Sequence, residues 1–341
     1  MNHKERLLAT LAGIPGDRPP FICPGGMMTM VVSEVMDQCH SFWPEAHSDP
    51  ELMAGLTLAA HELAGIENVG VPFCMTVEAE GMGAQVGLGS KESEPRVERY
   101  ILERFDQLER LTPLDPQSGR AAVCLEAIRI LKRRAPELPV IANLSGPVSL
   151  ATSLIDPLLY YRALRRDPEA AHRLTRHCTQ ELQRFGEVLI EAGADLICIA
   201  DPSATGDIIG RGAFLEIALP YLNQLTDHFK ERFGVPTIVH ICGNVKALGD
   251  GLSQLSAHAL SIDSLVGIDV LRELAPGRPT MGNISTILLE QGTPEQLARA
   301  SRRCLEQGVD ILAPACGIGP RTPLANIRAV AESVATPQDR A

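Results

Sequence analysis

Short apolar runs bounded by glycine or proline recur along the chain, and a segment with helical periodicity follows each of them. This alternation is typical of strand–helix units built around a parallel sheet. The runs predict eight strands, over residues 20–23, 68–73, 139–143, 195–200, 237–242, 259–262, 280–283 and 310–315. Eight strands favour a closed (β/α)8 TIM barrel over an open doubly wound sheet, and no GxGxxG or Walker sequence supports a nucleotide-binding fold.

Apolar residues return every three or four positions over 120–134, 170–192, 212–233 and 294–307, which predicts helices there. Two segments interrupt the alternation. We expect an elaborated loop with a helix over 25–50, and a hairpin or long loop without a helix over 76–100, where glycine recurs between 81 and 89. Since no low-complexity linker divides the chain, we expect one domain over 1–341.

The charge balance limits the partners. A formal net charge of −11 opposes binding to nucleic acid, and the densest basic stretches, 132–134 and 165–166, are typical of solvated helix faces. The sequence has no apolar run of membrane-spanning length and no signal-peptide pattern, so we expect a cytoplasmic protein. It leaves a homo-oligomer open.

Nine cysteines are scattered without the paired spacing of a disulfide scaffold. Cys124, Cys178 and Cys304 fall in helical patterns and Cys198 lies in an apolar strand, so we expect these four to fill the core.

Polar residues stand at the carboxyl ends of nearly all the predicted strands. In a TIM barrel these ends surround the active site. The residues concerned are Cys23, Asn143, Asp201, His240, Cys242, Asp263, Asn283 and Cys316.

His240 and Cys242 are two positions apart on a strand, so their side chains point to the same face. A set of His and Cys ligands with one open position is the preference of catalytic zinc, and Cys316 could complete the set. The alternative is a hydrogen-bonded core histidine beside ordinary thiols. Cys23 is a further candidate ligand, but it is equally compatible with a packed thiol.

These residues also resemble a known family. The sequence 240–244, together with Cys316 and Gly317, resembles the His-x-Cys…Cys zinc signature of the methylcobamide:coenzyme M methyltransferases, relatives of uroporphyrinogen decarboxylase. The similarity covers essentially the whole chain and includes the segments 4–6, 17–20, 143–147, 281–284 and 292–295.

The resemblance implies a (β/α)8 barrel in which His240, Cys242 and Cys316 bind zinc and activate a thiol substrate such as coenzyme M. It also implies a methylated corrinoid, delivered on a carrier protein, as co-substrate. Asp263 matches the position of an acidic fourth ligand in some members, although a helix N-cap is an equal alternative.

Two further expectations concern the substrates. Asn143, Asp201 and Asn283 would line the pocket, with capping and loop hydrogen bonds as the alternative. The glycine-rich segment 76–90 and the methionine-rich segment 27–36 would dock the carrier, with helix core as the alternative for the methionines.

Three other functions stay open. Tetrahydrofolate or another thiol could be the acceptor. A uroporphyrinogen decarboxylase resembles the chain less, because that branch has an arginine-bearing loop near the N-terminus where this chain has none over 23–30. The barrel could also be a non-catalytic scaffold that binds a corrinoid or tetrapyrrole.

Overall fold

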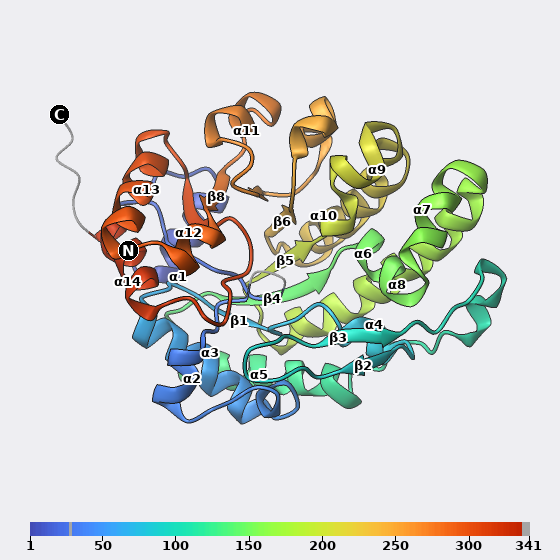
Figure 1. Ribbon diagram of the computed structural model, residues 1–341, viewed down its shortest axis with the longest axis horizontal. Coiled ribbons are helices and arrows are strands. Elements are labelled where there is room, and N and C mark those ends of the chain that lie inside the picture. Colours follow the sequence, from blue (N-terminus) through green and yellow to red (C-terminus); the bar gives the residue numbers. More distant parts are fainter. Residues whose placement is uncertain (27–28, 336–341) are drawn as a thin grey trace.

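The computed structural model describes residues 1–26 and 29–335. Its centre is a curled parallel sheet of seven strands in the order β1-β4-β5-β6-β7-β8-β9 (Figure 1). The strands are β1 (Val69–Val71), β4 (Val140–Ser145), β5 (Leu196–Ala200), β6 (Thr237–Ile241), β7 (Ala259–Ile262), β8 (Thr280–Ile284) and β9 (Ile311–Pro314). Neighbouring strands follow one another along the chain, so all carboxyl ends lie on the same side of the sheet. The architecture is TIM-barrel-like.

The first predicted strand, 20–23, is reduced to a single parallel bridge between Phe21 and Leu312. The Ile22 amide donates to the Leu312 carbonyl, and the Glu67 amide donates to the Phe21 carbonyl. This segment therefore lies between β9 and the chain before β1. Prolines on both sides, Pro20 and Pro24, lack the N–H groups that a longer ladder needs.

Helices surround the sheet (Figure 1). They are α1 (His3–Leu11), α2 (Ser33–Cys39), α3 (Pro50–Ala64), α5 (Gly119–Arg134), α6 (Pro147–Leu154), α7 (Pro157–Arg166), α8 (Pro168–Ala192), α9 (Gly206–Ala213), α10 (Leu219–Phe233), α11 (Ile268–Leu274), α12 (Thr286–Gln291), α13 (Pro294–Glu306) and α14 (Leu324–Ala335). The four predicted helices correspond to α5, α8, α10 and α13. A π-helical turn at Phe214–Ala218 precedes α10, and a capping box of Thr293 and Gln296 begins α13.

The segment 76–100 holds a short helix, α4 (Val77–Gly81), followed by an antiparallel pair, β2 (Gln85–Gly87) and β3 (Arg96–Arg99). The expectation of no helix was wrong for its first residues. The glycines that suggested a loop begin only at Gly81, whereas Val77 and Glu78 are buried and anchor the helical turn.

The core consists of the aliphatic strands and the inward faces of the helices. Cys124, Cys178, Cys198 and Cys304 are all buried, which confirms their predicted place in the core. Helices α8 and α10 approach closely at Gly186, where a Cβ atom would lie 2.3 Å from the ring of Phe229. Among the described helices, none combines the length and apolarity that crossing a membrane requires.

Candidate functional site

A histidine and two cysteines converge at the carboxyl ends of β6 and β9. His240 lies near the end of β6 and Cys242 directly follows that strand, while Cys316 lies two residues beyond β9. Their ligand atoms all lie within 4.8 Å of one another. The tertiary structure thus brings together two segments separated by more than seventy residues, as the sequence pattern predicted.

The distances within this group suit a shared metal ion. His240 Nε2 lies 3.1 Å from Cys242 Sγ, and Cys242 Sγ lies 3.1 Å from Cys316 Sγ. Zinc–sulfur and zinc–nitrogen bonds of about 2.0–2.3 Å let one ion reach all three atoms. One imidazole and two thiols are donors that zinc prefers, so these residues fit the metal by both spacing and chemistry.

The ring of His240 is held by the neighbouring strand. His240 pairs with Ser261 of β7 in the sheet register, and Nδ1 lies 2.9 Å from Ser261 Oγ. When Nδ1 donates this hydrogen bond, the lone pair of Nε2 faces Cys242. His240 is fully buried, so the ring orientation is fixed on all sides. Ser261 was missed in the sequence, because only the strand register identifies it.

The two thiols share one hydrogen bond. The contact with Cys242 and the nearby imidazole of His240 lower the pKa of the Cys316 thiol to about 4, whereas the same contact and burial raise the pKa of Cys242. Cys316 is therefore the more acidic thiol of the pair, and a thiolate at this position would favour a bound cation.

A tight turn exposes Cys242. Gly243 adopts a φ of 77°, and a Cβ atom there would lie 2.8 Å from Thr205 Oγ1. Only glycine combines this left-handed conformation with the close approach. The Gly243 amide donates to Asp263 Oδ2 at 3.2 Å, which fastens the turn to the loop after β7.

Asp263 lies beside the three-residue group but does not belong to it. Besides the bond from Gly243, its Oδ1 accepts a hydrogen bond from the Leu265 amide at 3.1 Å. Its charge raises the pKa of Cys242, so the carboxylate is close to that thiol. The described conformation is that of a turn cap, and a ligand role for Asp263 stays a prediction.

The carboxylate of Asp201 caps the amino-terminal end of helix α6. It accepts hydrogen bonds from the Val148 amide, the Ser149 amide and the Ser149 hydroxyl at 2.6–3.2 Å. Gly146 allows this position, because a Cβ atom there would lie 2.2 Å from Asp201 Cβ. Burial raises the pKa of Asp201 to about 6. Both carboxylate oxygens are committed to the helix, which corresponds to the capping alternative.

Asn143 and Asn283 also bond to the backbone. Asn143 Nδ2 donates to the carbonyls of Pro24 and Val71, while its buried Oδ1 has no hydrogen-bond partner among the described residues. Asn283 Nδ2 donates to the carbonyls of Asp263 and Val266 and so holds the loop after β7. A substrate-binding role for these residues stays a prediction.

The other sequence candidates are buried. Cys23 Sγ donates to the Thr29 carbonyl at 3.4 Å, and burial raises the pKa of this thiol well above its usual value. Cys23 is not part of the three-residue group. In the segment 27–36, Met30 and Met36 are fully buried, as expected for core residues, while positions 27–28 lie outside the described residues.

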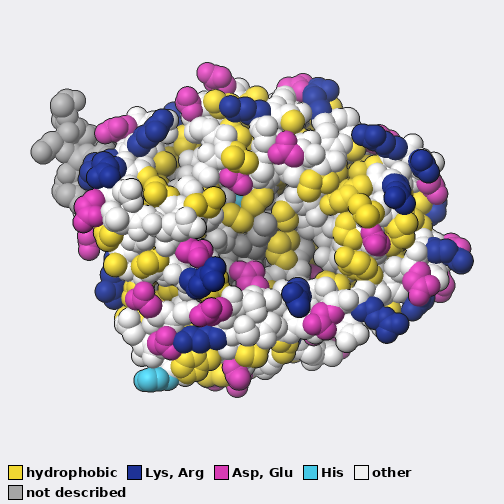
Figure 2. Space-filling view, in the orientation of Figure 1, with side chains coloured by type: hydrophobic (Ala, Val, Ile, Leu, Met, Phe, Trp, Pro, Cys, Tyr) yellow, Lys and Arg dark blue, Asp and Glu magenta, His cyan; other side chains and the backbone are white. Residues whose placement is uncertain are grey.

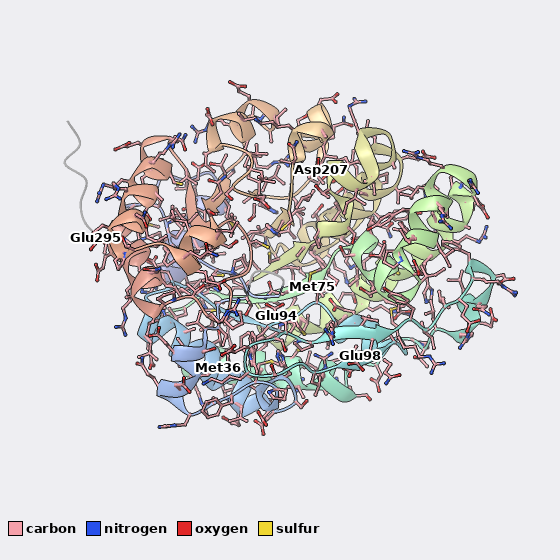
Figure 3. All side chains as sticks on the ribbon, in the orientation of Figure 1. Met36, Met75, Glu94, Glu98, Asp207 and Glu295 are labelled. Carbon is pink, nitrogen blue, oxygen red and sulfur yellow. The ribbon has the colours of Figure 1, made fainter. Side chains whose placement is uncertain are left out.

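No sequence pattern indicated Glu94, which lies between β2 and β3. Figure 3 shows Glu94 near the middle of this face, whereas Glu98 of β3 lies nearer its edge. Burial and the nearby Cys316 raise the pKa of Glu94 to about 7. The hairpin therefore brings an acidic group close to the sulfur atoms, which only the tertiary structure reveals.

Figure 2 shows that this face of the molecule is hollowed at its centre. Cys242 and Cys316 each keep part of their surface exposed, in contrast to His240. An ion on this group would have three protein ligands and one open position. That arrangement is typical of catalytic zinc and unlike a closed structural site.

Comparisons with known proteins agree over nearly the whole chain. The sequence profile of the family "Uroporphyrinogen decarboxylase (URO-D)" matches residues 2–336. A methylcobamide:CoM methyltransferase of Methanosarcina acetivorans is 35% identical, and one of Methanosarcina barkeri is 34% identical, each over 96% of both chains.

A solved structure gives the same result for the fold. A methyltransferase from Methanosarcina mazei superposes with a TM-score of 0.92 at 31% sequence identity, covering 98% of each chain. The curled sheet and its helices are therefore arranged as in that methyltransferase.

Proposed function

The chain belongs to the uroporphyrinogen decarboxylase (URO-D) family, and we propose that it transfers a methyl group from a methylated corrinoid to a thiol such as coenzyme M. The resemblance found in the sequence is thereby confirmed. We further propose that its sheet closes as a (β/α)8 barrel, since the Phe21 segment bonds on both sides, and that the barrel forms one domain.

One observation carries the choice of function: His240, Cys242 and Cys316 form a compact group of zinc-type ligands at the open end of the sheet. Zinc bound there would lower the pKa of an added thiol and supply a nucleophilic sulfur at neutral pH. The two relatives quoted above are named for methyl transfer to CoM.

The chain's residues have separate tasks in this reaction. Ser261 fixes the imidazole, Gly243 leaves Cys242 accessible, and the hydrogen bond from the Gly243 amide holds Asp263 next to it. We propose Asp263 as the acidic group that occupies the open ligand position before the thiol binds. We propose Asn143, Asp201 and Asn283 as the polar framework around the substrate.

The bond changes are balanced. The thiol loses its proton to solvent, and its sulfur forms a bond to the methyl carbon. The carbon–cobalt bond breaks, and cobalt keeps the bonding electron pair, passing from Co(III) to Co(I). We propose that the corrinoid arrives on a carrier protein, because a macrocycle of that size has to be presented to the hollow from outside.

The direct test combines metal analysis with an assay. Protein purified without added zinc should contain about one zinc per chain. It should demethylate free methylcobalamin with coenzyme M, which spectrophotometry follows as the formation of Co(I). The same assay includes homocysteine, 2-mercaptoethanol and tetrahydrofolate.

The outcomes separate the alternatives. Turnover with tetrahydrofolate alone would contradict a thiol acceptor. Zinc binding without any demethylation would favour a scaffold, and decarboxylation of uroporphyrinogen would favour the family's other branch.

A further inference from the structure

Helix α7 presents an unusual face to solvent. Leu158, Leu159, Arg162, Arg165 and Arg166 are all exposed and, at helical spacing, lie along one side of the helix. We refer to these five residues as the α7 face. Leu158 keeps 64% of its surface exposed, whereas Tyr160, two residues later and on the opposite side of the helix, is completely buried. The face thus joins two aliphatic side chains to three cations.

The three arginines form no ion pair with any described residue. In the other basic stretch, residues 132–134, each cation pairs with an acidic residue. Lys132 binds Asp195 at 2.7 Å, Arg133 lies 3.6 Å from Glu126, and Arg134 binds Glu51 at 2.6 Å. Arg299 and Arg303 of α13 also lack an ion pair with a described residue, but among the described helices α7 is the one that joins such arginines to exposed leucines.

The α7 face borders the open end of the sheet. Helix α6 starts at Pro147, directly after β4, and α7 follows it. Figure 2 shows hydrophobic side chains gathered over α6, α7 and α9, between the central hollow and a border of Lys and Arg side chains. Other exposed aliphatic residues come from the connections after β5, β7 and β8 at the same end: Ile208, Leu265 and Ile287.

The opposite end of the sheet contrasts with this rim. Among the large hydrophobic residues described as exposed, Ile14 lies with Gly16 and Pro279 around a cavity of about 570 Å³ at the amino ends of the strands. Exposed aliphatic surface is therefore concentrated around the hollow, where a partner that delivers a methyl group has to bind. Clustered apolar surface beside charge is typical of protein interaction sites.

We propose that the α7 face docks an acidic surface of the protein that carries the methylated corrinoid. This inference rests on the proposed function. The three arginines of the α7 face carry positive charge and therefore complement a negatively charged surface of a partner protein. The cations orient the carrier as it approaches, and the leucines contribute apolar contact once it is bound.

The test compares two triple variants that remove the same charge. Arg162→Ala/Arg165→Ala/Arg166→Ala empties the α7 face, and Lys132→Ala/Arg133→Ala/Arg134→Ala is the matched control. Methyl transfer to coenzyme M is measured with a methyl-loaded corrinoid carrier protein and, separately, with free methylcobalamin. We expect the α7 variant to lose about tenfold or more in kcat/KM with the carrier at low ionic strength, because steering contributes at least that much to association.

The control variant should keep the wild-type value within about twofold with the carrier, and both variants should keep it with free methylcobalamin. At about 0.5 M salt the difference between the variants should vanish, since charges are then screened beyond a few ångströms. Leu158→Ser/Leu159→Ser should still raise the KM for the carrier at that salt concentration, because apolar contact is not screened.

Several outcomes would overturn the docking proposal. One is an equal loss of kcat/KM with the carrier in both triple variants, and another is an unchanged kcat/KM in the α7 variant. A third is a wild-type protein that accepts methyl groups only from free methylcobalamin. A fourth is an α7 variant in which only nucleic-acid binding is altered. If the wild type demethylates neither the carrier nor free methylcobalamin, the proposed function itself fails and the docking proposal with it.

Discussion

Two groups of polar residues lie at the carboxyl ends of the strands, and they differ in the partners that their side chains contact. Asn143, Asp201 and Asn283 direct hydrogen bonds to nearby backbone or to a helix end. In contrast, His240 Nε2 contacts Cys242 Sγ, and Cys242 Sγ contacts Cys316 Sγ, so these side chains face one another rather than the backbone. The first group stabilises loops, while the second group gathers candidate ligand atoms in one place.

A polar residue at a strand end can therefore bond to the local backbone or join a group of side chains from several strands. A buried polar atom has to be satisfied, and the nearest partner decides how. Where a helix N-terminus lies above the strand, as at α6, the carboxylate of Asp201 satisfies it. At the ends of β6 and β9, the ligand atoms of His240, Cys242 and Cys316 lie together, and we propose that a metal ion is their shared partner.

The largest effect is expected in the ligand group. His240→Ala and Cys316→Ser should each reduce bound zinc to below a tenth of an equivalent and methyl transfer by about a hundredfold or more. A free thiol with a pKa of about 8.5 is only a few per cent ionised at neutral pH, and its orientation is lost as well. Metal analysis and the methylcobalamin assay measure both effects.

Cys198→Ala is the matched control for the ligand variants. Cys198 is a buried cysteine of β5 that takes no part in the group, so this variant should keep its zinc and its activity. Retention of zinc by the His240→Ala protein would contradict the assignment of the ligands.

The next effect is expected at Asp201. Asp201→Ala should lower the free energy of unfolding by about 2–3 kcal/mol, because it removes a helix cap and leaves buried amides of α6 unpaired. Asp49→Ala, which removes an exposed cap of α3, should cost about 1 kcal/mol or less. Urea unfolding measures both. Folded Asp201→Ala protein that has lost its zinc would place this residue in the ligand group after all.

The last effect is a pH dependence of stability, which reaches its full size only between the two ends of the titration of Asp201. Burial raises the pKa of Asp201 from 3.8 to about 6 in the folded protein, so folding favours the protonated form. The stabilisation is complete below pH 3.8 and is lost as the pH rises through about 6, by up to roughly 3 kcal/mol.

Comparison with Asp201→Asn isolates this titration. The unfolding free energy of the wild type minus that of Asp201→Asn should fall between about pH 4 and pH 6.5 and stay constant above pH 7. A difference that rises over this range would contradict the sign of the pKa shift. A constant difference would show that Asp201 does not titrate there.

Much of the molecule could be predicted from sequence. Periodicity identified seven strands and the main helices, because strand and helix patterns are local and buried strands read as apolar runs. Periodicity predicted a full strand around Phe21, but the flanking prolines limit the pairing there to a single bridge. It missed α4, because the glycines after it outweighed four helix-forming residues.

The sequence pattern was sufficient to group His240, Cys242 and Cys316 as candidate ligands. His240 and Cys242 share a strand face through their spacing, and Cys316 follows another strand at the same end of a parallel sheet. Only the tertiary structure decided what surrounds them. Ser261 reaches His240 through the register between strands, Glu94 approaches Cys316 through a hairpin, and Asp201 is drawn to α6. Such partners depend on contacts between segments distant in sequence, which local patterns do not encode.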